Sequence, residues 1–246
     1  MLSLLETHNI PSFLIGFKAK DDKINSWIHG LFYYKYLIKF RHIFCQDDDT
    51  NKFLKSKKIT NTSLIGDTRI NQILIDAKDQ YNNVRISDFI QKDIKTIIYG
   101  SIEKSDYSII RRTIKSMQNV NHIIVPHEIN STVINELKQF FSCSIYSEIK
   151  SVNTYKNNIL LIDVFGILKK IYKYSDIAYI GGGFNQGVHN TIEPSVYGNL
   201  ILFGPKHMNF PETYFLIKHK IAVCVNNESE FQKEIDQALK TTAKSK

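Results

Sequence analysis

The sequence predicts an α/β protein built on parallel β-sheets. Short apolar runs recur along the 246 residues, with segments of helical periodicity between them. The runs are "PSFLIGF", "RHIFCQ", "TSLIGD", "KTIIYGS", "NHIIVPH", "NILLID", "DIAYIGGG", "LILFGP" and "IAVCV". Such alternation is typical of a parallel sheet covered by helices. The runs tend to end at glycine, aspartate, histidine or proline, where open α/β sheets bind ligands.

The strands fall into two groups along the chain. The stretch "DAKDQYNNVRISDFIQKD", Asp76 to Asp93, is polar and weakly patterned. We therefore expect residues 76–93 to connect an N-terminal group of strands, 1–75, with a C-terminal group, 94–246.

The composition indicates a globular protein but does not indicate which partner it binds. A content of 43% hydrophobic residues is ample for a buried core, and the formal charge of +8 suits an anionic partner or reflects a coding bias toward lysine. Three scattered cysteines favour a reducing cytoplasm over a disulfide framework or a zinc site. Neither a signal peptide nor a membrane-spanning run is expected.

The densest group of special residues is "GGGFNQGVHNTIEP", Gly181 to Pro194, directly after an apolar run. Asn190 is expected as a helix N-cap, with Glu193 at capping-box spacing, which is a purely structural interpretation. The functional alternative is that the glycine turn and helix start approach a phosphate while Glu193 accepts hydrogen bonds from a ribose diol. Both interpretations stay open.

Two common phosphate-binding loops do not fit this stretch. A Walker A loop needs lysine after its last glycine, but Val188 and His189 follow Gly187. The dinucleotide pattern GxGxxG fails because Gln186 stands where its last glycine should be.

Two further segments have competing interpretations. Asp47 and Asp49 in "QDDDT" match a metal-binding DxD pattern, but we favour a role at the start of the helix that follows. In "WIHGLFYYKYLIKFRHIF", the residues at helical spacing predict a core-facing helix, and a basic membrane-facing segment is the alternative. These core positions are Trp27, Leu31, Tyr34 and Ile38.

Other strand ends carry polar or special residues. They are His127 in "IVPHEI", Asp163 and Gly166 in "LIDVFGIL", and Gly100 and Ser101 in "IYGSIEKSD". The carboxyl ends of parallel strands share one edge of a sheet, so we expect these residues to converge there and form a site.

These segments together resemble a known family. The stretch "AYIGGGFNQGVHNTIEPSVYGNLILFGP" is similar to the nucleotide-binding signature of the 3-deoxy-D-manno-octulosonic acid (Kdo) transferases. The segments "FCQDDDTNKFL", "GDTRINQI", "IIYGS", "IIVPHEI" and "LIDVFGILKKIYKYSDIAYIGGGF" occur in that family's order. The resemblance runs from Asn9 to about Phe231 and implies a GT-B fold with two Rossmann-like domains.

The resemblance implies a donor site for CMP-Kdo, mainly in the C-terminal domain. The donor-binding residues would be Pro126, His127, Phe165, Gly166, Ile167, Asn190, Thr191, Ile192 and Glu193, with Arg69, Gly100 and Ser101 beside them. The family has more of the acceptor domain ahead of "NIPSFLIGFKAK", including the general-base glutamate. We therefore expect residues 1–75 to be an incomplete acceptor-side domain without that base.

The resemblance also implies the reaction and its setting. Kdo would pass from CMP-Kdo to the lipid A precursor lipid IVA, without a metal or cofactor, at the cytoplasmic side of the inner membrane. A separate acceptor-domain chain is a possible partner, and no nucleic acid is expected. The alternatives are another GT-B enzyme, such as a UDP-sugar transferase or epimerase, and a non-catalytic nucleotide-binding protein.

Overall fold

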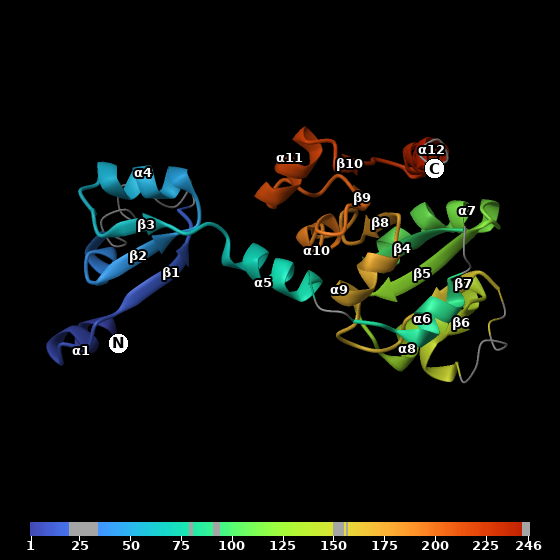
Figure 1. The fold of residues 1–246 in the computed structure, drawn as a ribbon, viewed down its shortest axis with the longest axis horizontal. Helices are drawn as coiled ribbons and strands as arrows, with labels where there is room; N and C mark the ends of the chain where they lie inside the picture. The colour runs from blue at the N-terminus through green and yellow to red at the C-terminus, as the bar shows by residue number, and fades with distance from the viewer. Residues whose placement is uncertain (20–33, 79–80, 91–93, 150–154, 156, 243–246) are drawn as a thin grey trace. The chain divides into compact units, whose positions relative to one another are not determined.

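The computed structural model describes all residues except 20–33, 79–80, 91–93, 150–154, 156 and 243–246 (Figure 1). The chain divides into two compact units, Met1–Gln72 and Ile73–Lys246. Each contains a parallel β-sheet, so the predicted α/β class is confirmed.

The first unit has a three-stranded parallel sheet in the order β1-β2-β3. Its elements are α1 (Leu2–Thr7), β1 (Phe13–Phe17), β2 (His42–Cys45), α4 (Asp48–Ser56), β3 (Thr62–Leu64) and the start of α5 (Thr68–Ala77). Asp47 is the N-cap of α4, and its carboxylate accepts a hydrogen bond from the Thr50 N–H at 2.8 Å. The helix-start interpretation of the aspartate cluster is thus supported.

The core of this unit differs from the predicted one. Leu37 is buried, whereas Tyr34 and Ile38, predicted to face the core, are 39% and 52% exposed. The helical turn ends at Leu37, so helical spacing does not continue to Ile38. Trp27 and Leu31 lie outside the described residues.

The second unit has a seven-stranded sheet in the order β10-β9-β8-β4-β5-β7-β6, with every neighbouring pair parallel. Its strands are β4 (Lys95–Ile102), β5 (Val120–Pro126), β6 (Ser144–Ile145), β7 (Ile159–Leu161), β8 (Ile177–Ile180), β9 (Leu200–Phe203) and β10 (Ala222–Cys224). Each of the nine predicted runs contains a strand of the structure. The strand β6 was not predicted, because two residues carry no periodicity.

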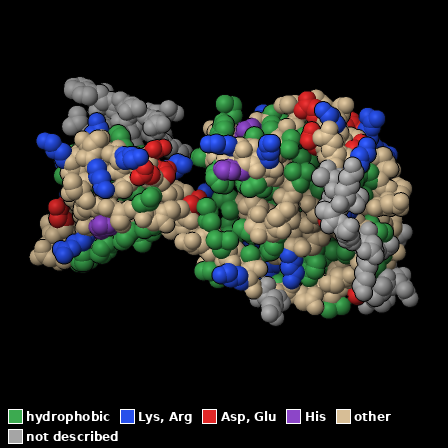
Figure 2. Space-filling model, turned by 45° about the horizontal axis from the view of Figure 1, so that its top comes forward, with side chains coloured by type: hydrophobic (Ala, Val, Ile, Leu, Met, Phe, Trp, Pro, Cys, Tyr) green, Lys and Arg blue, Asp and Glu red, His purple; other side chains and the backbone are tan. Residues whose placement is uncertain are grey.

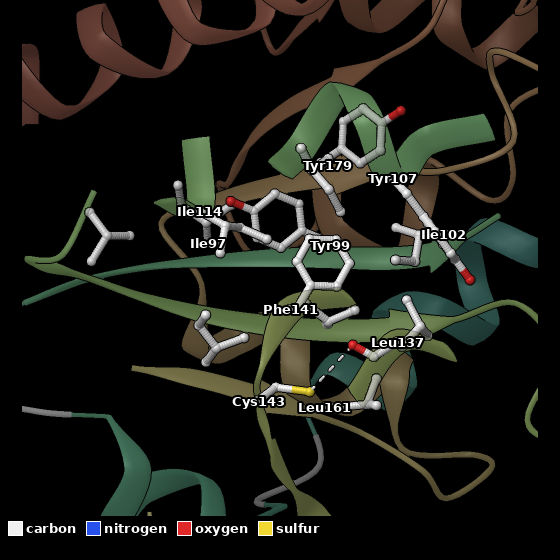
Figure 3. Close-up of a cluster of buried hydrophobic side chains, with 14 of the residues drawn as sticks. Ile97, Tyr99, Ile102, Tyr107, Ile114, Leu137, Phe141, Cys143, Leu161 and Tyr179 are labelled. Carbon is white, nitrogen blue, oxygen red and sulfur yellow. Dashed lines mark hydrogen bonds between the residues drawn. The ribbon is translucent and has the colours of Figure 1, made fainter. Parts of the chain in front are cut away.

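Helices cover both faces of this sheet (Figure 1). One face packs against α7 (Tyr107–Ser116), α8 (Ser131–Phe141) and α12 (Glu228–Thr242). The other packs against α6 (Val84–Phe89), α9 (Leu168–Ile171) and α11 (Pro211–Lys218). Figure 3 shows the first core cluster, in which Tyr99 and Tyr179 lie among aliphatic side chains. This two-sided burial explains the near-continuous apolar character of the central strands.

The stretch expected to be a connection contains part of the second unit. Ile86 and Phe89 of α6 are buried in the second core cluster, and the units divide between Gln72 and Ile73. The helix was overlooked because its apolar positions stand among polar residues that face the solvent.

Lys and Arg side chains are dispersed on the face that Figure 2 draws. They are spread over both units, with neutral and hydrophobic areas between them. None of the helices in the described part of the chain has the length and apolar character needed to cross a membrane.

A buried histidine lies in the centre of the second unit. His122 is fully buried on β5, with Nε2 3.0 Å from the Met117 carbonyl oxygen and Nδ1 3.0 Å from the Tyr99 hydroxyl. Burial lowers the pKa of His122 to about 4 from an ordinary value of 6.5, although the hydrogen bond to Met117 opposes this. Between these two pH values the unfolded chain binds the proton and the folded chain does not, so acid favours unfolding.

We therefore expect His122→Gln to remove part of the acid sensitivity of folding. Glutamine can keep both hydrogen bonds and does not titrate. The free energy of unfolding of the wild type, relative to the variant, should fall by about 3 kcal/mol between pH 7 and pH 4. Urea denaturation at a series of pH values measures this difference, and a difference independent of pH would contradict the prediction.

Candidate functional site

The predicted strand ends meet where the strand order of the large sheet reverses. The chain runs outward from β4 to β5 on one side and through β8, β9 and β10 on the other, so β4 and β8 flank the switch point. In open α/β sheets the crevice outside the carboxyl ends of such strands binds ligands. The glycine stretch from Gly181 follows β8 at this point, and its Gly181 N–H donates to the Gly100 carbonyl oxygen at 2.9 Å.

A buried carboxylate fixes this part of the site. Asp106, in the 3-10 turn η1 (Lys104–Asp106), is fully buried. Its Oδ1 accepts from the Tyr179 hydroxyl at 2.6 Å, and its Oδ2 accepts from the backbone N–H groups of Glu103 and Gly182 at 2.8 and 3.0 Å. Burial raises the pKa of Asp106 despite these donors. The carboxylate thus joins the end of β4 to the glycine loop.

The glycines of this loop are required by close packing of the backbone. A Cβ added at Gly181 would lie 2.3 Å from the Ser101 carbonyl oxygen, and one at Gly183 would lie 2.6 Å from the Gly204 nitrogen. Gly182 has a φ of +84°, in the left-handed region. The sequence suggested that these glycines give a phosphate access to the backbone, but at Gly181 and Gly183 the close neighbours are other strand ends.

The end of β4 is irregular. The pairing of β4 with β5 shifts register between Gly100 and Ile102, and the intervening Ser101 has a φ of +53°. Such a conformation in a residue other than glycine marks local strain of the kind found at functional sites. Gly100 has a packing role, since a Cβ there would lie 2.0 Å from the Tyr172 hydroxyl.

Three polar side chains cluster beside this strand end. His127 follows the last residue of β5 and is exposed, and its ring stacks on that of half-buried His189 with centroids 4.1 Å apart and planes 16° apart. Glu103 accepts from His189 Nε2 at 3.0 Å through one oxygen and from Asn185 Nδ2 at 2.7 Å through the other. Burial raises the pKa of Glu103, but the hydrogen bonds from Asn185 and His189 and the charges of the imidazoles outweigh it, so the pKa lies below its usual value.

This cluster contains metal-ligating residue types. One ligand atom each from Glu103, His127 and His189 lie within 4.8 Å of one another, and His₂Glu is a donor set used by zinc enzymes. A metal ion lies near the plane of each imidazole that binds it. Two stacked rings with nearly parallel planes share no such point close by, so a metal would require one ring to turn.

Glu193 lies in a separate part of the glycine stretch, at the start of α10 (Ile192–Ser195). Burial raises its pKa, and the charge of Lys169 and a hydrogen bond from the Asn190 side chain, 3.0 Å long, only partly oppose this. The expected capping box is not formed: the N-cap is Thr191, and Asn190, one residue earlier, accepts from the Ile192 N–H. The Asn190 side chain caps the Ile192 N–H through its oxygen and donates to Glu193 through its nitrogen, so the Glu193 carboxylate meets an amide side chain.

The other predicted residues lie in three places. Pro126 ends β5, and Ile192 is buried at the start of α10. The exposed Phe165, then Gly166 and Ile167, lie between β7 and α9 at the same edge of the sheet. Arg69 belongs to the first unit, where its guanidinium pairs with the carboxylate of Asp67.

Thr191 has an environment that the sequence could not indicate. Its side chain is fully buried, and its hydroxyl has no hydrogen-bond partner among the described residues. Buried hydroxyl groups are rarely left in this state without a ligand or water.

The sequence reasoning missed Glu103 and the role of His189. Glu103 lies in "IYGSIEKSD", which was noted for Gly100 and Ser101, and His189 lies in the glycine stretch. The two residues are 86 positions apart in the chain. The available signal was that Glu103 directly follows the apolar end of β4.

A hollow of about 780 Å³ lies beside α7. It is lined by Ser108, Arg111, Arg112, Lys115, Ser116, Phe140 and Glu228. The Arg111 guanidinium lies over the ring of Phe140, 4.6 Å from its centroid. None of the predicted site residues lines this hollow.

Solved structures identify the class of the fold. The chain resembles the UDP-GlcNAc 2-epimerase of Neisseria meningitidis, with a TM-score of 0.67 and 16% identity over 98% of this chain and 64% of that one. It also resembles the C-terminal CMP-Kdo binding domain of WaaA from Acinetobacter baumannii, with a TM-score of 0.51 and 18% identity over 71% and 89%. At such identities the likeness establishes the fold, which is the predicted α/β fold of GT-B type.

Curated sequences point to a particular family within that class. The chain is 25% identical over 201 residues to a 3-deoxy-D-manno-octulosonic acid transferase of Rickettsia bellii, and 31% identical over 152 residues to one of Aquifex aeolicus. These matches cover 78% and 58% of this chain. A bifunctional glycosyltransferase/methyltransferase of Fusobacterium nucleatum is 33% identical over 58% of this chain.

These relatives confirm the resemblance to the Kdo transferase family, although no family model matches the chain. The chain spans less than half the length of each of the three, with 47% of the Rickettsia protein, 41% of the Aquifex protein and 23% of the Fusobacterium protein covered.

The packing of the glycine loop gives a stability prediction. Gly181→Ala should destabilise the second unit by more than about 3 kcal/mol or prevent folding, because the new methyl group overlaps rigid backbone. Gly198→Ala is the matched control: a Cβ there has open space, and only the φ of +76° opposes it, at a cost of about 1 to 2 kcal/mol. Urea denaturation of both variants checks the order, and equal losses would contradict the packing argument.

Proposed function

We propose that this chain acts in the transfer of Kdo from CMP-Kdo to the lipid A precursor lipid IVA. The observation that carries the proposal is that the predicted donor residues of the second unit lie at the carboxyl edge of one parallel sheet. The similarity to the 3-deoxy-D-manno-octulosonic acid transferase of Rickettsia bellii, which extends over 78% of this chain, also supports the proposal.

Glu193 is the best candidate for binding the ribose of CMP. It is a half-buried carboxylate at the start of α10, with one oxygen already engaged by Asn190. Neighbouring Thr191 has a buried hydroxyl that a ligand could satisfy. We assign Pro126, His127, Phe165, Gly166, Ile167, Asn190 and Ile192 to the same donor site, together with Gly100 and Ser101 at the end of β4. For the first unit, taken by itself, we propose Arg69 as a basic residue that contacts the donor.

The proposed chemistry is an inverting substitution. A hydroxyl oxygen of the acceptor attacks the anomeric carbon of Kdo, and its proton passes to a base. The bond from that carbon to the phosphate oxygen of CMP breaks, and the phosphate takes the electron pair. The donors that surround this phosphate would stabilise its developing charge, which is usually the largest contribution in such a step.

The setting follows from the acceptor. Lipid IVA is a membrane lipid, so the protein would work peripherally at the cytoplasmic side of the inner membrane. A separate chain that supplies an acceptor domain remains part of this proposal.

A second candidate is a UDP-sugar enzyme. The reason to keep it is the fold likeness to UDP-GlcNAc 2-epimerases, which extends over nearly the whole chain. The two candidates predict different nucleotides.

Nucleotide binding by the purified chain tests the proposal. Calorimetry should show saturable binding of CMP and much weaker binding of UDP. Glu193→Ala should weaken CMP binding roughly 10- to 100-fold, because hydrogen bonds to a charged group are lost. Glu234→Ala, on α12, is the control and should bind CMP like the wild type, since this helix contributes no residue to the candidate site.

Preferential binding of UDP would favour the second candidate. CMP binding that survives Glu193→Ala unchanged would remove Glu193 from the site. A folded wild-type chain that binds neither nucleotide would contradict both candidates.

A further inference from the structure

We propose that His127 and His189 form the subsite for the phosphate group of the donor, and that Glu103 is a positioning residue that acts through His189. The inference deepens the proposed function and rests on it, since it takes the ligand to be a nucleotide. Glu103 lies outside the sequence segments on which the family resemblance rests.

The backbone holds the two imidazoles at the switch point. The His127 N–H donates to the Ile102 carbonyl oxygen at 3.0 Å, which ties the end of β5 to the end of β4. The His189 N–H donates to the Gly181 carbonyl oxygen at 3.1 Å, within the glycine loop after β8. Two rings from segments far apart in the chain therefore stack at the edge where the ligand is expected.

Glu103 determines how His189 can meet a ligand. A carboxylate only accepts hydrogen bonds, and its pKa lies below the usual value, so at neutral pH the proton between Glu103 and His189 is on Nε2. Nδ1 has no hydrogen-bond partner among the residues that the structure describes, and it can donate to a phosphate oxygen when the ring carries both protons, as a cation. The same contact fixes the ring on which His127 stacks.

The carboxylate does not make the cluster unsuitable for an anion. One oxygen of Glu103 is engaged by His189 and the other by Asn185, so its charge is directed toward donors. Charged groups near the cluster include Asp106, whose oxygens are satisfied by Tyr179 and the backbone, and the ion pair of Lys104 with Glu136. Lys206 donates to the Asn185 carbonyl oxygen, and the exposed Glu128 follows His127 in the chain. The exposed side of the cluster is the imidazole of His127.

Comparison of CMP with cytidine isolates the phosphate contact. The wild type should bind CMP more tightly than cytidine. Glu103→Gln should weaken CMP binding roughly tenfold and leave cytidine binding unchanged, because it removes the charge but keeps the shape. Glu234→Gln on α12 is the matched control and should change neither affinity. If Glu103 had a purely structural role, Glu103→Gln would change the affinities for CMP and for cytidine alike.

A double variant tests whether Glu103 acts through His189. His189→Ala should lose CMP affinity by at least as much, and adding Glu103→Gln to it should cause no further loss. His127→Ala offers an independent route, because its side chain is exposed and lies outside the core. This variant should also reduce the preference for CMP over cytidine.

Several results would overturn the inference. They are an unchanged CMP affinity in Glu103→Gln, an equal loss of cytidine binding, and a Glu103→Gln effect that persists in the His189→Ala background. Tight binding of Zn²⁺ that requires both histidines would make the cluster a metal site instead. A folded wild type that binds neither CMP nor cytidine would contradict the proposed function itself, whereas the other results leave that function standing.

Discussion

The site depends on one buried carboxylate, that of Asp106. Its two oxygens accept from the Tyr179 side chain and from two backbone N–H groups, one at the end of β4 and one in the glycine loop. A buried carboxylate without these donors would be costly, so strand, loop and side chain are held in one arrangement. Glu103 provides one of these N–H groups and Gly182 the other, and the backbone of His189 is bonded to Gly181, beside Gly182. Asp106 therefore also holds Glu103 and His189 at hydrogen-bonding distance.

Close backbone packing is the second constraint, and it explains why the richest motif contains so many glycines. Gly181 and Gly183 lie against Ser101 and Gly204, where a methyl group has no room. The loop therefore packs closely against the ends of β4 and β9. The residues after it, from His189 to Glu193, follow at the same end of the sheet. The strained φ of Ser101 belongs to the same crowded region.

The sequence predicted the sheet well because burial on both faces leaves an unmistakable pattern. Runs such as "KTIIYGS" become central strands that are buried between their first and last residues, whereas β6, with two residues, is too short to leave a pattern. Strand ends could be predicted as site positions, since topology alone brings them together. The contact between Glu103 and His189 could not, because it depends on the loop conformation that Asp106 and the glycines impose. The buried position of Leu37 was missed for a similar reason, since a helix end is set by local geometry.

Two glutamates at this sheet edge experience opposite environments, and the contrast bears on their roles. Donors to both of its oxygens lower the pKa of Glu103, while burial raises the pKa of Glu193, which has one amide donor and a partly compensating lysine. Near the ordinary pKa of glutamate, Glu103 is therefore mostly ionised and Glu193 mostly protonated. Pairs of carboxyl groups driven apart in this way commonly divide the work of a site. Under the proposed function, Glu103, with its lowered pKa, orients an imidazole, and the less solvated Glu193 gains most from the hydroxyl donors that a ribose would bring.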